Sequence, residues 1–235
     1  MNINNENTKG HIHPISRVLD EITMAFIELG FEVVLCNESD DEYHNFDALN
    51  VPADHPARDM QDTFWLKDFP KNLLRTQTSN SQIHYMQKNK PPFMITAPGK
   101  VYRYEATDKT HEVQFHQVEG LVVGEKISMA NLKFTLNAFI KKIFGDNVEI
   151  RFRPGYFPFV EPGVEIDMRQ GKGKWIEVLG AGMVNKEVLN NVGINPNKYQ
   201  GFAFGIGADR IAMLKYGVDD LRNFYNGDLR LVNQF

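Results

Sequence analysis

The clearest pattern of apolar residues lies near the start of the chain. Apolar side chains recur there at spacings of three and four from 15 to 29, between Pro14 and Gly30. Such spacing places them on one face of an amphipathic helix, and proline and glycine are typical of its two ends. A second helix is predicted over about 128–144, where the same spacing recurs before a glycine at 145 that would end it.

Shorter segments have the composition of β-strands. They are rich in β-branched and aromatic residues and are bounded by turn-forming residues, including a Gly-Lys-Gly-Lys turn at 171–174. The predicted strands are 31–35, 101–105, 115–123, 148–153, one through Glu165 and Asp167, 175–179 and a glycine-rich strand that runs into a helix near Ala208. Helices do not alternate with every strand, so we predict an α+β fold in which an antiparallel sheet is flanked by helices. Residues 1–235 are expected to form a single domain.

Polar side chains alternate with apolar ones along these strands and should therefore share one face of the sheet. Arg103 and Glu105 share a face of one strand, and the polar segment 106–114 is short enough to close a hairpin to the next. The other residues that follow this alternation are Phe115, Gln117, Glu119, Glu149, Arg151, Arg153, Glu165, Asp167 and Glu177. One interpretation is a solvated sheet face. The other is the floor of a cleft for a charged ligand, with ATP and a metal ion as natural candidates.

The composition limits the class of protein and its partners. The chain has 42% hydrophobic and 24% charged residues, as in an ordinary globular protein. Its start is polar, without the apolar core of a secretory signal or membrane anchor, and its one cysteine, Cys36, allows no intrachain disulfide, so the expected location is the cytoplasm. A net charge of −4 argues against binding nucleic acid by bulk charge alone.

The segment Gly201-Phe-Ala-Phe-Gly-Ile-Gly-Ala-Asp-Arg210 combines glycines with an arginine in a predicted first helical turn. Glycines allow close approach of the backbone, and a phosphate would suit a helix start that carries a guanidinium. Glycines at such junctions also commonly serve packing. The segment is neither a Walker loop nor a dinucleotide-binding fingerprint.

Three stretches resemble the class-defining motifs of the class II aminoacyl-tRNA synthetases: the opening helix and strand through 55–58, Arg103-Tyr-Glu105 with 115–119, and 205–210. Further stretches are similar to the bacterial-type phenylalanyl-tRNA synthetase alpha subunits, namely Asn45-Phe-Asp-Ala-Leu-Asn50, Arg151-Phe-Arg-Pro154, Tyr156-Phe-Pro-Phe159, Gly201-Phe-Ala-Phe-Gly205 and the terminal Asn-Gln-Phe235. The resemblance covers about 14–235. It implies a sheet of six to seven antiparallel strands with helices.

The resemblance also implies roles for individual side chains. The implied ATP-binding residues are Arg103 at the α-phosphate, Glu105, His111, Phe115 stacked on adenine, Gly207, and Arg210 at the terminal phosphate. The implied amino-acid-binding residues are Ser79, Gln82, Gln117 and Glu119 at the ammonium and carboxylate, Phe157 and Phe159 at the ring, and Ala203 at the end of the pocket. Glu177 is either a metal contact or a paired strand carboxylate.

The implied reaction is activation of phenylalanine with ATP and Mg²⁺ and its transfer to tRNA(Phe). Arg103 and Arg210 would stabilise charge on the phosphates, and no protein nucleophile is required. The implied partners are a phenylalanyl-tRNA synthetase beta subunit and a second copy of the chain, bound through the first motif.

Several positions depart from the family pattern. The family usually has His, Pro, Arg and His-Pro where this chain has Gln77, Asn80, His84 and Asn185-Lys186. Gln77 forms hydrogen bonds but can neither transfer a proton nor carry a charge, so we expect amino-acid recognition or transfer to tRNA to be altered. Only a polar tail of about 1–12 precedes the first helix, in the place of the family's helical tRNA-binding arm.

These departures leave two other functions open. One is a stand-alone paralog that forms an aminoacyl-adenylate for an acceptor other than tRNA. The other is a non-catalytic pseudo-synthetase that acts as a binding or regulatory module.

Overall fold

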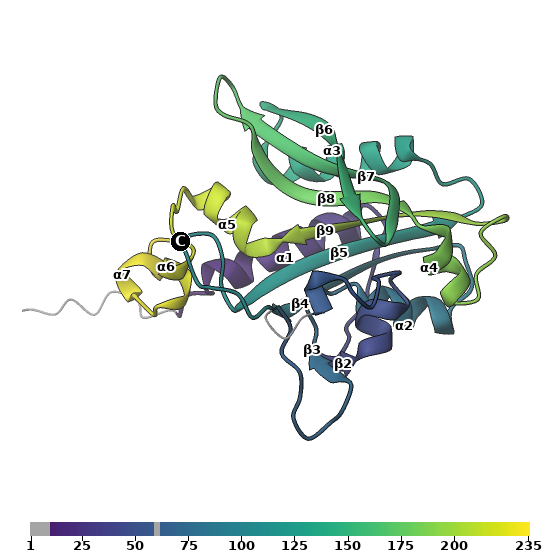
Figure 1. The fold of residues 1–235 in the computed structure, drawn as a ribbon. Helices are drawn as coiled ribbons and strands as arrows, with labels where there is room; N and C mark the ends of the chain where they lie inside the picture. Colours follow the sequence, from purple (N-terminus) through teal and green to yellow (C-terminus); the bar gives the residue numbers. More distant parts are fainter. Residues whose placement is uncertain (1–9, 59–61) are drawn as a thin grey trace, which may run out of the picture.

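The structure is a computed structural model that describes residues 10–58 and 62–235. Most of the predicted polar tail, 1–9, therefore lies outside the described residues. Within them, a seven-stranded sheet in the order β1-β4-β5-β9-β8-β7-β6 forms the centre of the fold (Figure 1). Its strands are β1 (Glu32–Val33), β4 (Phe93–Tyr102), β5 (Gln114–Gly124), β6 (Val148–Phe157), β7 (Val160–Gln170), β8 (Ile176–Val184) and β9 (Gln200–Gly207). A separate pair consists of β2 (Ser39–Asp41) and β3 (Asn72–Leu74).

The helices include those predicted from the apolar spacing. The helical elements of the described ranges are α1 (Pro14–Glu28), α2 (Asn80–Lys88), α3 (Met129–Phe144), α4 (Lys186–Asn191), α5 (Ala208–Tyr216), α6 (Arg222–Tyr225), α7 (Leu229–Val232), the π-helical turn η1 (Tyr43–Asp47) and the 3-10 turn η2 (Pro56–Arg58). The predictions of α1, α3 and α5 are confirmed. In the described parts of the chain, no helix is long and apolar enough to cross a bilayer.

The prediction of an antiparallel sheet is wrong at one edge. Every other pair of neighbouring strands in the described sheet is antiparallel, but β1 runs parallel to β4. Parallel neighbours need a long connection that returns the chain to the same end of the sheet. The segment between them supplies it, because it contains β2, β3 and α2.

One face of the sheet is buried beneath α1, α3 and α5. The ring of Phe26 on α1 stacks on those of Phe139 on α3 and Phe204 on β9, with centroids 4.7 and 4.8 Å apart. A side chain at 120 would overlap the ring of Phe204, so the glycine there lets this ring lie flat on β5. The aromatic stack therefore supports β5 and β9 from the helix-covered side of the sheet.

The opposite face is covered only in part. A second core cluster joins η1, α2 and α4 to the sheet, and its buried members include Phe46, Ile83 and Leu189. The sequence did not predict α2, because most of its side chains are polar and three of those, Asn80, Ser81 and Gln82, are buried. The middle of this face remains uncovered.

A single row of directly paired residues crosses the uncovered face. It runs through Glu119 on β5, Gly205 on β9, Gly180 on β8, Glu165 on β7 and Arg153 on β6. Directly opposed residues of antiparallel strands project to the same side. The predicted alternation is thus confirmed, and glycines lie between the charged residues of the row.

The hairpin predicted between the two strands of the second motif is also confirmed, with one change. β4 ends at Tyr102, so Arg103 and Glu105 follow the strand rather than lie within it. Pairing continues by one bond, because the Arg103 amide donates to the Val113 carbonyl at 3.0 Å.

Candidate active site

A cavity of about 470 Å³ opens on the uncovered face. This volume falls in the range of small-molecule sites. The predicted residues that line it are Ser79, Gln82, Arg103, Glu105, Gln117, Glu119, Phe157, Phe159 and Ala203. The fold therefore brings together nine of the residues implied by the resemblance, from segments far apart in the chain.

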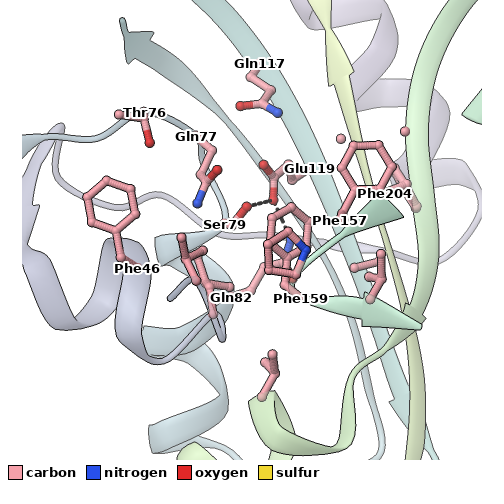
Figure 2. Close-up of a pocket in the computed structure, with 18 of the residues that line it drawn as sticks. Phe46, Thr76, Gln77, Ser79, Gln82, Gln117, Glu119, Phe157, Phe159 and Phe204 are labelled. Atoms are coloured by element: carbon pink, nitrogen blue, oxygen red, sulfur yellow. Dashed lines mark hydrogen bonds between the residues drawn. The ribbon is translucent and has the colours of Figure 1, made fainter. Parts of the chain in front are cut away.

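The polar end of the cavity is built around Glu119, which is only 4% exposed. Ser79 Oγ and Gln82 Nε2 both donate to Glu119 Oε2, each at 2.6 Å (Figure 2). Ser79 directly precedes α2 and Gln82 lies in its first turn, so the start of one helix supplies both donors. The carboxyl group is thereby held in one orientation at the base of the cavity.

Burial raises the pKa of Glu119 to about 7. The hydrogen bonds from Ser79 and Gln82 and the charges of Arg103 and Arg75 act in the opposite direction but do not cancel the effect of burial. A cationic group placed beside this carboxyl would favour its ionised form. The site is therefore suited to receive an ammonium group.

Arg103 lies at the same end of the cavity and is fixed on two sides. Its guanidinium carbon lies 5.0 Å from the centroid of the Phe115 ring, and its Nε donates to the Thr76 carbonyl at 3.1 Å. Burial lowers the pKa of Arg103, and the nearby charge of Glu105 opposes this. Arginine stays protonated under such conditions, so the cavity contains a fixed cation.

The other end of the cavity is aromatic and apolar. The rings of Phe157 and Phe159 are stacked, with centroids 6.0 Å apart, and Figure 2 shows them together across from Phe46. A Cβ atom at Gly180 would lie 2.7 Å from Phe157 Cζ, so this glycine lets the ring lie against β8. Ala203 adds its methyl group from β9.

Five predicted residues do not line the cavity. They are His111, Phe115, Gly207, Arg210 and Glu177. Phe115 adjoins it beneath Arg103, and Gly207 is paired with Gln117 on the floor. Arg210 lies in the first turn of α5, while His111 pairs with Asp108 at 3.0 Å on an exposed loop.

Glu177 belongs to a network of ion pairs farther along the same face. Arg151 Nε and Arg153 Nε each donate to the buried Asp167 carboxylate at 2.7 Å, and Arg153 pairs with Glu165 at 2.8 Å. Glu177 lies 3.5 Å from Arg153, and its side chain is 59% exposed. These strands thus carry paired charges, whereas the cavity floor lies on β5, β9 and β8.

Sequence reasoning from strand alternation missed the residues that η1 and the 75–79 loop contribute to the cavity. Phe46, Thr76 and Gln77 all line it. Asn45 joins the two segments, since its Nδ2 donates to Thr76 Oγ1 at 3.1 Å and its carbonyl accepts from Gln77 Nε2 at 3.1 Å. Their signals were the family-specific stretch around Asn45 and the departure from the family pattern at Gln77, because loops have no periodicity.

Comparison with known proteins gives a family model over the whole chain and relatives over 96% of it. The family model of the tRNA synthetases class II core domain (F) matches residues 1–235. The phenylalanine–tRNA ligase alpha subunit of Proteus mirabilis (strain HI4320) is 56% identical over 226 residues, which are 96% of this chain and 68% of that protein. The alpha subunit of Dehalococcoides mccartyi (strain ATCC BAA-2100 / JCM 16839 / KCTC 5957 / BAV1) is 53% identical over 244 residues, with 96% and 70% covered.

Among solved structures, pyrrolysyl-tRNA synthetase from Desulfitobacterium hafniense has a similar fold. Its TM-score is 0.74 at 16% identity, with 94% of this chain and 76% of that chain covered. This likeness concerns the fold alone, and it confirms the predicted α+β architecture of the class II synthetases. The family model and the close relatives show that this chain belongs to the class II tRNA synthetases, in the family of the phenylalanine–tRNA ligase alpha subunits.

Proposed function

We propose that this chain activates phenylalanine with ATP and transfers it to tRNA(Phe) together with a beta subunit. One observation carries the proposal: a single cavity joins a buried carboxyl group at one end to two stacked phenyl rings at the other. An α-amino acid with an aromatic side chain has the matching polarity along its length. Membership of the family supports the same substrate.

The amino acid would lie along the cavity floor. Glu119, oriented by Ser79 and Gln82, would accept the ammonium group, and Gln117 would contribute a further polar contact. Phe157 and Phe159 would hold the phenyl ring, because aromatic pairs favour stacked or edge-to-face contacts.

The class II family uses ATP, and the residues beside the cavity fit it. Arg103 is a fixed fork of donors suited to a phosphate, and it adjoins an aromatic ring suited to a base. We assign Arg103 to the α-phosphate, Phe115 to adenine and Arg210 to the terminal phosphate. Further contacts would come from Glu105, His111 and Gly207.

Mg²⁺ suits the carboxylate of Glu177. Mg²⁺ commonly takes one or two protein carboxylates and completes its shell with water and substrate phosphates. Glu177 is exposed and lies beyond ordinary hydrogen-bond length from Arg153, so its oxygens are accessible. Bound Mg²⁺ would supply neutralisation of charge on the phosphate oxygens.

In this scheme the substrate supplies the nucleophile. The carboxylate of phenylalanine attacks the α-phosphorus of ATP, a new P–O bond forms, and pyrophosphate leaves. Arg103 stabilises the charge on the phosphoryl oxygens, while the cavity holds the reacting groups in line. A ribose hydroxyl of tRNA then attacks the activated carbonyl and AMP leaves.

The remaining assignments follow the family. We infer that residues 1–235 act as one catalytic domain in the cytoplasm and that a beta subunit takes part in tRNA binding. Self-association through the first class II motif is part of the same proposal.

Amino-acid-dependent exchange between ATP and pyrophosphate tests the first half-reaction. The expected result is exchange with phenylalanine well above every other standard amino acid. No exchange with any amino acid would instead support a pseudo-synthetase. Charging of tRNA is then measured with and without a phenylalanine–tRNA ligase beta subunit, and exchange without charging in both cases would support an acceptor other than tRNA.

A further inference from the structure

Three side chains with the chemistry of metal ligands meet outside the cavity. They are Cys36, which follows β1, Asp40 on β2 and His84 on α2. The cysteine sulfur, a carboxylate oxygen and an imidazole nitrogen all lie within 4.8 Å of one another, and each residue is partly buried. The proposed reaction uses none of the three.

The surrounding structure holds each of these residues in place. The Cys36 carbonyl accepts a hydrogen bond from Arg75 Nη1 at 3.1 Å, and Arg75 is 3% exposed. Asp40 Oδ2 accepts from Asn80 Nδ2 at 2.6 Å. The Asn80 amide is itself oriented, because its Oδ1 accepts from the Ser81 amide at 2.9 Å. Metal sites commonly use such outer partners to orient their ligands.

His84 is oriented in the same way. Its Nε2 lies 2.8 Å from Asp40 Oδ2, and its ring stacks on that of His44 with centroids 3.9 Å apart. His44 is held in turn by Asp41, whose Oδ1 lies 2.8 Å from His44 Nδ1. The imidazole nitrogen of His84 is therefore directed at the carboxylate of Asp40.

The ligand types select the metal. Thiolate and imidazole together suit Zn²⁺, whereas Mg²⁺ and Ca²⁺ take oxygen ligands. Ligand atoms in tetrahedral zinc sites lie about 3.3–3.8 Å apart, so short rotations of these side chains suffice to bring them together.

We propose that Cys36, Asp40 and His84 form a zinc site, with a water molecule at the fourth position. Zinc here would fasten the start of α2 to the β1–β2 segment. The same helix start carries Ser79 and Gln82, which orient Glu119. The metal would thus stabilise the scaffold of the cavity without touching the substrates.

Cobalt reports directly on this site, because Cys36 is the only cysteine of the 235 residues. A thiolate ligand gives Co²⁺ a charge-transfer band in the near ultraviolet. Titration of the metal-free chain with Co²⁺ should produce this band with one equivalent per chain, and Zn²⁺ should abolish it. Absence of the band in the parent protein would overturn the proposal.

Four variants identify the ligands. Cys36→Ser and Asp40→Asn should lose or weaken the band. His84→Arg keeps a hydrogen-bond donor for Asp40 but cannot bind metal, so it should fold and should also lose the band. His11→Asn changes an exposed histidine elsewhere and should retain it. A band that persists in His84→Arg, or that needs two chains per metal, would contradict the site.

Alkylation of Cys36 gives a second measurement. Zn²⁺ should slow the reaction of the parent thiol with iodoacetamide at least tenfold and should not slow it in His84→Arg. Equal rates with and without Zn²⁺ in the parent would show that the three residues form a hydrogen-bonded cluster only.

Discussion

Glu119 on β5 lies directly opposite Gly205 on β9. A Cβ atom at 205 would lie 2.9 Å from Gln117 Nε2 and 3.4 Å from Glu119 Cγ. The bare backbone at this position is therefore what leaves space for two polar side chains at the end of the cavity.

Gly205→Ala should raise the KM for phenylalanine at least tenfold, because the new methyl group must displace the Gln117 amide. That amide is also held from the other side, since its oxygen accepts from the Thr78 backbone at 3.3 Å. Gly207→Ala is the matched comparison, as its Cβ would meet only Arg210 Cβ at 3.7 Å. Pyrophosphate exchange at varied phenylalanine should give a higher KM for the first variant than for the second, and equal values would contradict this account.

The stability of the substrate-free protein should depend on pH through Glu119. Its pKa is raised by burial to about 7, so the folded state favours the protonated form. The contribution of protonated Glu119 to the stability of the folded state is therefore complete below the pKa that this residue has in the unfolded chain. It is lost as the pH rises through about 7. At 1.36 kcal/mol per pKa unit the loss is about 3 kcal/mol. Urea unfolding between pH 5 and pH 8 measures it as a falling free energy of unfolding.

Glu119→Gln is the control for this dependence. The amide keeps the shape of the protonated acid and does not titrate. In this variant the free energy of unfolding should therefore fall much less with rising pH. Phenylalanine binding should release a proton from Glu119 near pH 6.5, because an ammonium group favours the carboxylate. Calorimetry in buffers of different ionisation enthalpy measures this release, which should vanish in the variant.

Arg103→Ala should lower the rate of activation about a hundred- to thousandfold while the protein stays folded. The guanidinium faces the cavity and contributes to charge stabilisation rather than to the apolar core. Arg169→Ala removes an arginine that pairs with Glu149 elsewhere on the sheet, and it should leave activation unchanged. Exchange within a few-fold of the parent for Arg103→Ala would refute the role given to the second motif.

Ala203 should limit the length of the side chain that the cavity accepts. Ala203→Gly removes the methyl group and should admit para-chlorophenylalanine, whereas Ala203→Ser should weaken phenylalanine. The parent should reject tyrosine by only about a hundredfold, since an apolar pocket discriminates weakly against an added hydroxyl. Exchange with the three amino acids at matched folded concentrations measures this, and no gain on the chloro analogue in a folded glycine variant would count against the assignment.

The sequence predicts those helices and strands in which buried side chains recur at the regular spacing of the element. The spacing in α1 and α3 and the alternation of Gln117 and Glu119 follow directly from this. α2 was not predicted, because most of its side chains are polar. Its buried side chains include Ile83 and Met86, which pack in the second core cluster, and also Gln82, which donates to the carboxyl of Glu119.

That these site residues lie together in space could be predicted only from the resemblance to a family. No spacing in the sequence indicates that Ser79 reaches Glu119, since the contact depends on how a loop and a helix start return to the sheet. The grouping of Cys36, Asp40 and His84 is a further case, because it joins three different elements and has no motif.

The alternation along β9 has a consequence for how such an enzyme changes over generations. Ala203 and Gly205 border the cavity, while the ring of Phe202 and the side chain of Ile206 are buried in the core on the helix-covered side. Heritable changes at the first set should alter the choice of substrate, and changes at the second should alter the tolerance to heat. Substitutions at position 203 can therefore change the amino-acid substrate without changes in the core on the helix-covered side.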